Sequence, residues 1–411
     1  MEKSFLTEFK KRDYFNQCTN SEELEALMNK KKIRAYIGFD CTASSLHVGS
    51  LLQIMCLRLL QKHGHQPIVL LGGGTTRIGD PSGKEETRKI LSEKQIENNI
   101  KNIEKVFKIF LKTNNSKLKP IFVNNYKWLG KLNYIKFLRE IGKHFTINKM
   151  LSFDSVKLRL DREQSLSYME FNYMILQAYD FLELNKVKNC LMQIGGSDQW
   201  GNIINGVELI KRYSGKQVFG LTTPLITLAS GSKMGKTEKG AVWLDNKILS
   251  AYDYWQFWRN TDDRDVIKFL KMFTDLKISE IEKISDSNIN DLKVILANET
   301  TTMLHGKAAA KKAEQTAKET FEKGTFGDDL PVVNVKKNQI SSGLNIIDLV
   351  ITTNLLNSKS EVRRAIKNKG IKINNETVED EKLSLSIDKF DEKNILKISH
   401  GKKRHVLLKL V

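Results

Sequence analysis

The 411-residue chain is poor in cysteine and contains no long apolar run. None of its cysteines forms a C-x-x-C pair, and the four are scattered as Cys18, Cys41, Cys56 and Cys190. This spacing favours neither a zinc site nor a disulfide framework, and it fits small core residues in a reducing compartment. No apolar stretch reaches membrane-spanning length, and the charged first twelve residues lack the apolar core of a signal peptide. We therefore expect a cytoplasmic protein with no membrane partner.

A P-loop is also missing, although two segments come close to one. In residues 231–237 only three residues separate the two glycines, where the motif needs four. After the segment 80–84, Glu85 stands where the motif needs Ser or Thr. These mismatches argue against a P-loop ATPase or a GTPase. No repeat of fixed period is visible, so a solenoid is not indicated.

Length and charge set the scale of the molecule. A chain of 411 residues can form two or three domains with buried cores. Its 67 Lys and Arg residues against 48 Asp and Glu residues leave a net charge of +19. Such an excess is typical of proteins that bind nucleic acids, but solubility charge or an AT-rich genome would produce it too. Charge alone leaves both interpretations open.

The first half of the chain alternates between strand and helix patterns. The predicted elements are a strand at 34–39, a helix at 46–63, a strand at 66–71, a helix at 168–184, a strand at 189–194 and a helix at 200–213. This alternation favours an α/β fold with a parallel sheet and helices on both faces. Ligands of such sheets bind beyond the carboxyl ends of the strands. Glycines stand at those ends here: Gly38, Gly72 to Gly74, Gly195 and Gly196.

The second half changes character. Residues 249–323 lose the strand pattern and are predicted to be mostly helical, and 324–343 is typical of a linker. Farther on, Ser360 could cap a short helix that places Arg363, Arg364 and Lys367 on one face. Residues 371–378 indicate two short strands around an Asn-rich turn.

Two separated motifs carry the chemistry. The first is H-V-G-S at 47–50, which follows a predicted strand and starts a helix, where backbone amides attract phosphate. The second is K-M-G-K-T at 233–237, a glycine-flexed loop with two ammonium groups that could close over a triphosphate. Alone, the first could be an ordinary helix start and the second a solvated basic loop. Together they indicate an enzyme that activates a carboxylate with ATP.

Longer segments resemble those of the bacterial-type tyrosyl-tRNA synthetases, a family of class I aminoacyl-tRNA synthetases. The matching segments are Y-I-G-F-D-C-T-A-S-S-L-H-V-G at 36–49, G-D-P-S-G-K at 79–84, Y-M-I-L-Q-A-Y-D-F at 173–181 and Q-I-G-G-S-D-Q-W-G-N at 193–202. The resemblance spans essentially the whole chain. It implies a Rossmann-like parallel-sheet catalytic domain at 1–247, with a dimer-forming insertion and the KMSKS-type loop at 233–237. An all-α anticodon-recognition domain at 248–325, a linker at 326–343 and a small α+β S4-like RNA-binding domain at 344–411 would follow.

The resemblance also implies a role for individual residues. The substrate tyrosine is expected among Tyr36, Asp80, Tyr173, Gln177, Asp180, Gln193 and Gln199, with Tyr36 and Asp180 at its phenol. ATP is expected against Gly38, Asp40, His47, Gly49, Ser50, Gly196, Asp198 and Lys236. The catalytic group that stabilises the leaving pyrophosphate would be Thr42, His47, Lys84, Arg88, Lys233, Lys236 and Thr237. Arg363, Arg364 and Lys367 would contact tRNA. Spacing adds that Tyr173, Gln177 and Asp180 share one helix face.

The implied reaction has two steps and needs no tightly bound cofactor. The tyrosine carboxylate attacks the α-phosphorus of Mg-ATP, which gives tyrosyl-adenylate and pyrophosphate; the tyrosyl group then moves to the 3'-terminal adenosine of tRNA(Tyr). Positioning and charge neutralisation suffice, and no residue is expected to bind a metal. The family is homodimeric.

Two positions depart from the family pattern, and three alternatives remain. The family has His or Asn at Ser50, whose hydroxyl can donate but is shorter, and it often has a bulkier aromatic residue at Met234. A tryptophan-specific synthetase shares the motifs but would not need the pair Tyr36 and Asp180. A non-enzymatic RNA-binding or splicing protein could lose the catalytic motifs, and another class of nucleotidyltransferase would not need the S4-like tail.

Overall fold

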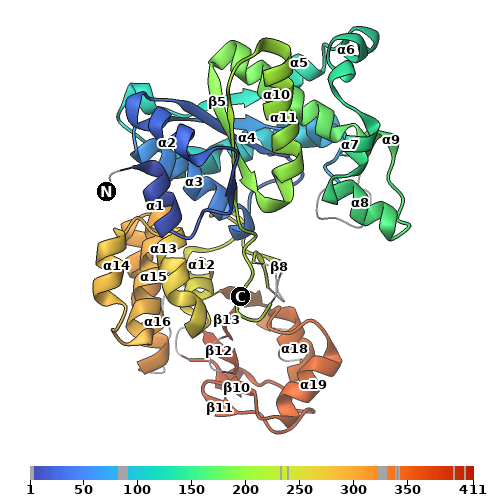
Figure 1. Cartoon of the computed structure of the whole chain (residues 1–411). Coiled ribbons are helices and arrows are strands. Elements are labelled where there is room, and N and C mark those ends of the chain that lie inside the picture. Colours follow the sequence, from blue (N-terminus) through green and yellow to red (C-terminus); the bar gives the residue numbers. More distant parts are fainter. Residues whose placement is uncertain are drawn as a thin grey trace. The chain divides into compact units, whose positions relative to one another are not determined.

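The computed structural model describes residues 4–81, 91–231, 234–237, 240–322, 331–337, 340, 343–391, 394–401 and 404–411. For residues 154, 155, 236, 237 and 320–322 it describes the backbone alone. The chain divides into two compact units, Met1–Gly306 and Lys307–Val411. Figure 1 shows the elements of both units along the chain.

The first unit is built on a six-stranded sheet in the order β1-β6-β5-β2-β3-β4. Its strands are β1 (Gln17–Cys18), β2 (Arg34–Phe39), β3 (Gln66–Leu71), β4 (Ile121–Asn124), β5 (Cys190–Gly196) and β6 (Phe219–Thr223). All pairings are parallel except that of the edge strand β1 with β6. The chain runs outward from β2 through β3 to β4, and then returns to the other side of β2 for β5 and β6. The sheet therefore has a topological switch point between β2 and β5, where ligands of parallel sheets bind.

Helices cover both faces of this sheet, as predicted. They are α1 (Phe5–Lys11), α2 (Ser21–Lys30), α3 (Leu51–Lys62), α4 (Glu93–Phe110), α10 (Tyr173–Lys188) and α11 (Trp200–Ser214). Helix α3 packs with α4, and α10 packs with α11. Strands β3 and β4 lie on one side of β2, and β5 and β6 lie on the other. Because parallel crossovers are right-handed, the two helix pairs therefore lie on opposite faces of the sheet. All six are amphipathic or apolar enough to bury one face; α3 alone buries Leu51, Leu52, Ile54, Met55, Leu57, Leu59 and Leu60.

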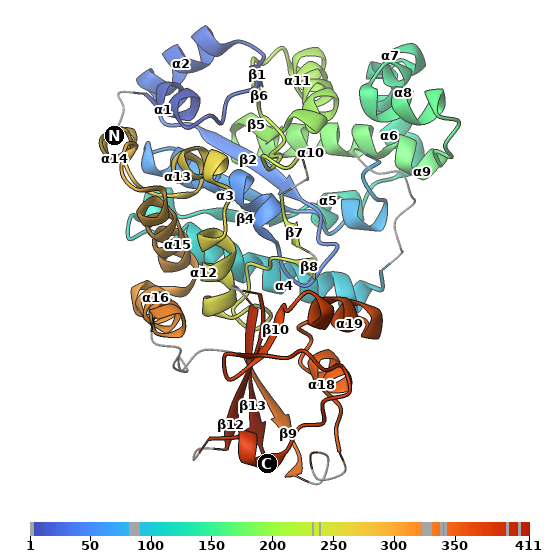
Figure 2. The same ribbon diagram turned by 90° about the horizontal axis from the view of Figure 1, so that it is seen from below.

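Short helices between β4 and α10 form an insertion at one side of the sheet, seen in both views (Figures 1 and 2). They are α5 (Tyr126–Leu129), α6 (Tyr134–Glu140), α7 (Ile147–Leu151), α8 (Asp154–Asp161) and α9 (Tyr168–Phe171). The single helix predicted at 168–184 is wrong, because it is broken between α9 and α10 at Asn172. There Asn172 Nδ2 donates to the carbonyl oxygen of Tyr168 at 2.7 Å. A side-chain amide near its own backbone competes with helix continuation in this way.

The rest of the first unit is a small hairpin followed by helices. The hairpin is β7 (Lys236–Thr237) paired with β8 (Gly240–Ala241). The helices are α12 (Ala251–Arg259), α13 (Val266–Phe273), α14 (Ile278–Ile284) and α15 (Ile289–His305), which confirm the helical character predicted from 249 onward. Aromatic side chains fill their core: Trp258 contacts Tyr254, Phe269 and Phe273.

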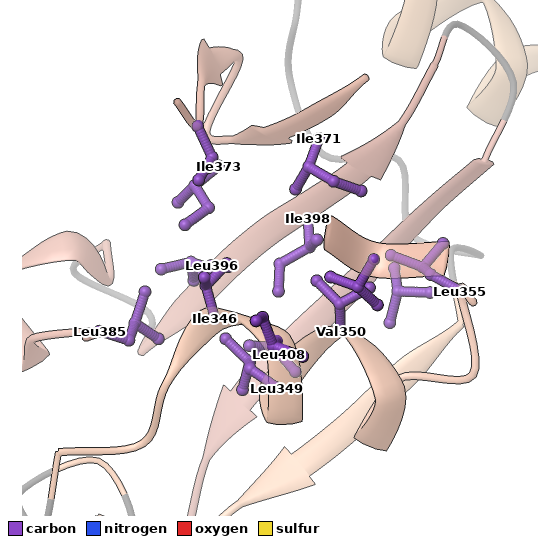
Figure 3. Packing of buried hydrophobic residues seen from close by; sticks show 14 of the residues in the cluster. Ile346, Leu349, Val350, Leu355, Ile371, Ile373, Leu385, Leu396, Ile398 and Leu408 are labelled. Atoms are coloured by element: carbon purple, nitrogen blue, oxygen red, sulfur yellow. The ribbon is translucent and has the colours of Figure 1, made fainter. Parts of the chain in front are cut away.

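The second unit begins with α16 (Lys307–Glu322) and contains a five-stranded sheet in the order β11-β10-β12-β13-β9. Its other elements are β9 (Val332–Val335), α18 (Ile346–Thr352), α19 (Lys359–Lys367), β10 (Ile371–Ile373), β11 (Glu376–Thr377), β12 (Ile395–His400) and β13 (Arg404–Leu410). Figure 3 shows the core between this sheet and its helices, where Leu349 and Val350 meet Leu396, Ile398 and Leu408. The predicted hairpin is confirmed, since Asn374 and Asn375 take positive φ values of 46° and 73° in its turn.

Two expectations for the second half need correction. The segment 326–343, expected as a linker, contains β9, whose Val332, Val333 and Val335 are β-branched residues that pair in parallel with β13. Ser358, not Ser360, caps α19: its backbone is extended, and its side chain accepts from the amide of Glu361.

Candidate active site

The switch point of the parallel sheet opens into a cavity of about 440 Å³. This volume lies in the range of small-molecule binding sites. The cavity is lined by the carboxyl ends of β2 and β5, the start of α3, and the face of α10 that carries Tyr173, Gln177 and Asp180. It lies where the strand pattern predicted a ligand site.

Most of the candidate residues line this one cavity. The lining includes all seven of the expected tyrosine-binding residues: Tyr36, Asp80, Tyr173, Gln177, Asp180, Gln193 and Gln199. It also includes Thr42 and seven of the expected ATP-binding residues: Gly38, Asp40, His47, Gly49, Ser50, Gly196 and Asp198. Residues separated by more than 150 positions in the chain thus lie around one cavity. The face of α10 that carries Tyr173, Gln177 and Asp180 points into this cavity.

The basic catalytic residues are only partly covered by the structure. Lys84, Arg88 and Lys233 lie outside the described residues. Lys236 and Thr237 form strand β7, of which the backbone alone is described. Their catalytic roles therefore stay predictions.

Tyr36 and Asp180 form a buried polar end of the cavity. Both residues line it and are almost inaccessible, with 0% and 1% of their surface exposed. The hydroxyl of Tyr36 has no hydrogen-bond partner in the described part of the chain. Burial, with the nearby Asp180 carboxylate, raises the pKa of Tyr36 well above its ordinary value, so its hydroxyl stays a donor. Gln53 and Gln193 add two more buried side-chain oxygens without a described partner to the lining. Buried polar groups without a partner cost free energy, so a polar ligand that pairs with them would bind favourably.

Two neighbours that the sequence did not single out hold the Asp180 carboxylate. Trp128 Nε1 donates to Asp180 Oδ1 at 2.7 Å, and Asn125 Nδ2 donates to Asp180 Oδ2 at 2.9 Å. Burial raises the pKa of Asp180 to about 7, although these two hydrogen bonds favour the charged form. Asn125 follows β4, a strand that the pattern analysis did not predict. Had β4 been recognised, the rule that sites lie at carboxyl strand ends would have pointed to this residue.

A second chain of hydrogen bonds joins this end to Asp40. Asn125 Nδ2 also donates to Thr75 Oγ1 at 3.0 Å, and Thr75 Oγ1 donates to Asp40 Oδ1 at 2.7 Å. The hydroxyl of Tyr173 donates to Asp40 Oδ2 at 3.2 Å. Gly72 permits this arrangement, because a Cβ there would lie 2.4 Å from Asp40 Oδ1 and 2.5 Å from Thr75 Oγ1. The carboxylates of Asp180 and Asp40 thus belong to one network.

The remaining polar residues form a third set around Asp80. Gln199 Nε2 donates to Asp80 Oδ2 at 2.9 Å, and Gln177 Nε2 donates to Gln199 Oε1 at 3.3 Å. Asn202 Nδ2 donates to Gln177 Oε1 at 2.9 Å. One carboxylate with amide oxygens nearby is a suitable environment for an ammonium group.

The two ATP-type motifs contact each other although about 185 positions separate them. His47 caps a short 3-10 turn (Val48–Ser50), with its Nδ1 accepting from the amide of Gly49 at 3.0 Å. A Cβ on Gly49 would lie 2.9 Å from the carbonyl oxygen of Met234, and one on Gly235 would lie 2.8 Å from His47 Nδ1. The amide of Val48 donates to Val242 just beyond the hairpin at 2.9 Å. Both positions therefore favour glycine: Gly49 lies against the backbone of Met234, and Gly235 lies against the His47 ring and takes a φ of +120°.

The candidate tRNA-binding residues lie in the second unit. Arg363, Arg364 and Lys367 are all exposed on α19, and Val362 and Ile366 of the same helix are buried. The predicted basic face is therefore present. Arg363 Nε lies 3.8 Å from Glu381 Oε2, a loose surface ion pair.

Two further observations concern the described residues. They contain no group of three or more His, Cys, Asp or Glu side chains arranged to hold a metal ion. Among the helices described, none combines the length and apolarity of a membrane span.

Comparisons with known proteins agree along the whole chain. Residues 28–322 match the family described as tRNA synthetases class I (W and Y), and residues 321–408 match the tyrosine–tRNA ligase SYY-like C-terminal domain. The chain is 67% identical over 407 residues to a tyrosine–tRNA ligase of Pelagibacter ubique and 53% identical over 411 residues to one of Xanthobacter autotrophicus. These matches cover 99% of this chain and 99% and 98% of the two relatives. A C-terminally truncated mitochondrial tyrosyl-tRNA synthetase of Aspergillus nidulans superimposes with a TM-score of 0.70 at 30% identity, covering 78% of this chain and 95% of that one. The chain belongs to the class I tRNA synthetases and, within them, to the tyrosine–tRNA ligase family.

Proposed function

We propose that this protein is a tyrosine–tRNA ligase, which activates L-tyrosine with ATP and transfers it to the 3'-terminal adenosine of tRNA(Tyr). The observation that carries the proposal is the buried pair of Tyr36 and Asp180 at one end of the cavity. A phenol placed there would donate to the Asp180 carboxylate and satisfy the hydroxyl of Tyr36. A ligand without that hydroxyl would leave the buried hydroxyl of Tyr36 unpaired, at a cost typical of buried polar groups.

The other end of the cavity suits the amino acid backbone and the nucleotide. Asp80, Gln177 and Tyr173 would hold the ammonium group. Asp40 and Asp198 would accept hydrogen bonds from the ribose hydroxyls, and Gly38 and Gly196 would let adenosine approach the backbone. Mg²⁺ would arrive bound to the phosphates of ATP.

Activation then needs positioning and charge neutralisation. The tyrosine carboxylate attacks the α-phosphorus and pyrophosphate leaves, with no covalent enzyme intermediate. We assign the developing negative charge to Thr42, His47, Lys84, Arg88, Lys233, Lys236 and Thr237. Support for this comes from the contact of the 47–50 motif with Met234 and Gly235. Ser50 also lines the cavity, so its hydroxyl is close enough to the nucleotide site to replace the usual His or Asn.

The second half of the chain would provide the tRNA contacts. We assign catalysis to residues 1–247, anticodon recognition to the helices from 248, and further RNA binding to the sheet unit with Arg363, Arg364 and Lys367. Binding through phosphate contacts should weaken with salt. Because the reaction uses tRNA and ATP, we place the protein in the cytoplasm.

We also propose that the enzyme is a homodimer. The insertion exposes a group of large apolar side chains: Tyr134, Ile135, Ile147, Leu158, Leu160 and Tyr168. Tyr134 and Tyr168 hydrogen-bond through their hydroxyls at 2.7 Å, which ties α6 to α9. Several large apolar side chains exposed on one small insertion are typical of an interaction surface.

The decisive experiment is pyrophosphate exchange with each of the twenty amino acids. Tyrosine should support exchange, and tryptophan and phenylalanine should not compete with it. In Tyr36→Phe the ratio of kcat/KM for tyrosine to that for phenylalanine should fall about tenfold, the effect of one net hydrogen bond. Exchange that depends on tryptophan, or on no amino acid, would refute the assignment.

A further inference from the structure

The base of the 233–237 loop is fixed by a carboxylate from the helical part of the first unit. Ala229, four residues before Lys233, donates its backbone amide to Asp265 Oδ2 at 2.8 Å. Asp265 is 5% exposed and stands at the N-cap position of α13. An aspartate at this position ordinarily accepts from its own helix. Here it makes no such bond, and its carboxylate reaches the loop.

Backbone hydrogen bonds also shape the turn that Asp265 holds. The amide of Gly231 donates to the carbonyl oxygen of Leu228 at 2.8 Å, and Gly231 takes a φ of +81°. The amide of Met234 donates to Ile226 across the loop base at 3.3 Å, a long hydrogen bond. The bond from Ala229 to Asp265 is shorter than the bond from Met234 and is charge-assisted, so it is the stronger of these two.

Helix α13 connects this turn to the first ATP motif. At its far end Arg12 donates to the carbonyl oxygens of Lys271, Thr274 and Leu276, at 2.8 to 3.1 Å. Just beyond the helix, Asp275 binds Arg58 and Lys62 of α3. Helix α3 starts directly after the 47–50 motif. The helix that anchors the loop is therefore fixed to the element that carries the other half of the nucleotide site, and Figure 2 shows α13 beside α3.

We propose that Asp265 is a positioning residue for tyrosine activation, which acts by holding the turn at Ala229 so that the 233–237 loop meets the triphosphate in a fixed place. The inference rests on the proposed function, since it assigns the loop to ATP. Groups that stabilise a transition state must be held in place before the reaction. Loss of the anchor should therefore lower the rate of activation and leave tyrosine binding intact, because Asp265 is not among the residues that line the cavity.

The test compares Asp265→Ala with Asp265→Asn, whose amide oxygen can still accept from Ala229. In Asp265→Ala, kcat for tyrosine-dependent pyrophosphate exchange should fall about tenfold, with KM for tyrosine changed less than twofold. Asp265→Asn should recover most of the rate. Asp262→Asn is the matched control. It removes one charge from the 3-10 turn that contains Asp265, keeps a capping side chain at the start of that turn, and should behave as wild type. An unchanged kcat in Asp265→Ala would overturn the proposal. A higher KM for tyrosine together with a lower melting temperature would also overturn it, because that combination indicates that Asp265 has only a structural role.

Hydrogen exchange of residues 226–231 in the full-length protein gives a readout independent of activity. The amide of Ala229 should exchange faster in Asp265→Ala than in wild type and Asp262→Asn. Unchanged exchange would overturn the anchor. If wild type showed no tyrosine-dependent pyrophosphate exchange, the proposed function would fail, and this measurement would still decide whether Asp265 holds the turn.

Discussion

Asp180 is a carboxylate in a place that water hardly reaches, with its two oxygens occupied by Trp128 and Asn125. Burial opposes the charge and the two donors support it, which leaves its pKa at about 7. The pair of donors also determines orientation, since each oxygen has its own partner. A tyrosine phenol would thus find an acceptor whose direction is set in advance.

This environment predicts a pH-dependent contribution to stability. An ordinary aspartate, such as Asp180 in the unfolded chain, has a pKa of 3.8. In the folded protein the pKa of Asp180 is about 7. Between these values the folded state binds the proton more firmly, so the free energy of unfolding falls as pH rises. Asp180→Asn lacks this titration. The free energy of unfolding of Asp180→Asn minus that of wild type should therefore increase by about 2 to 3 kcal/mol from pH 5 to pH 8.

Urea unfolding of both proteins at the two pH values measures this difference. The variant places an amide donor opposite the donors Asn125 and Trp128, but that conflict is present at both pH values and cancels in the comparison. A difference that does not change with pH would show that Asp180 titrates as an exposed carboxyl does.

At the scale of elements, caps and turns decide where the helices and strands of the second unit begin. Helix α19 starts after Ser358, whose hydroxyl accepts from the amide of Glu361 at 3.2 Å, and Glu361 in turn accepts from the amide of Asn357 at 3.0 Å. Ser360 lies inside the first turn. The sequence analysis expected Ser360 as the cap, but the extended backbone at Ser358, with φ at −143°, identifies Ser358 as the capping residue.

Removal of the correct cap should loosen α19. In Ser358→Ala the free energy of local opening should fall by about 1 kcal/mol, equivalent to about fivefold faster amide exchange in residues 359–367. Ser360→Ala is the matched control and should have little effect. Amide exchange is the suitable measurement because all five tryptophans lie before residue 307, so tryptophan fluorescence does not report on this unit. Equal effects of the two variants would contradict the assignment of the cap.

At the scale of the whole molecule, the exposed apolar surface of the insertion predicts self-association. Ile135 is 71% exposed on α6; its neighbour in the chain, Tyr134, is 55% exposed, and Tyr168, which hydrogen-bonds Tyr134, is 67% exposed. A charge placed among such residues would have to be buried in a dimer interface, at a cost of several kcal/mol.

Ile135→Glu should therefore convert a dimer into a monomer. Sedimentation velocity at micromolar concentration measures the change directly. Val187→Glu is the control, because Val187 is also an exposed apolar residue, at 58%, but lies on α10 outside the insertion. A wild-type protein that sediments as a monomer, or an Ile135→Glu variant that stays dimeric, would refute the proposed interface.

Much of the fold and site could be predicted from local patterns. The strand at 66–71 matches β3 residue for residue, and the helix at 200–213 is one residue short of α11. The spacing of Tyr173, Gln177 and Asp180 correctly placed three polar residues on one face of α10, because helical periodicity is a local property. These predictions depend on short-range rules, and the resemblance to the family implied the residue roles.

Other features depended on contacts between distant parts of the chain. Strand β9 was expected to be part of a linker, because a four-residue extended segment is recognisable as a strand only by its pairing. Its partner is β13, about 70 residues later in the chain. Asn125 and Trp128 were overlooked because their partner Asp180 is more than 50 positions away. The sequence was sufficient for periodicity, turn chemistry and the family; packing alone decided which carboxylates are buried, which donors hold them and where the loop is anchored. The reason is physical: local conformation follows from neighbouring residues, whereas burial and its effect on charge exist only once the chain has folded.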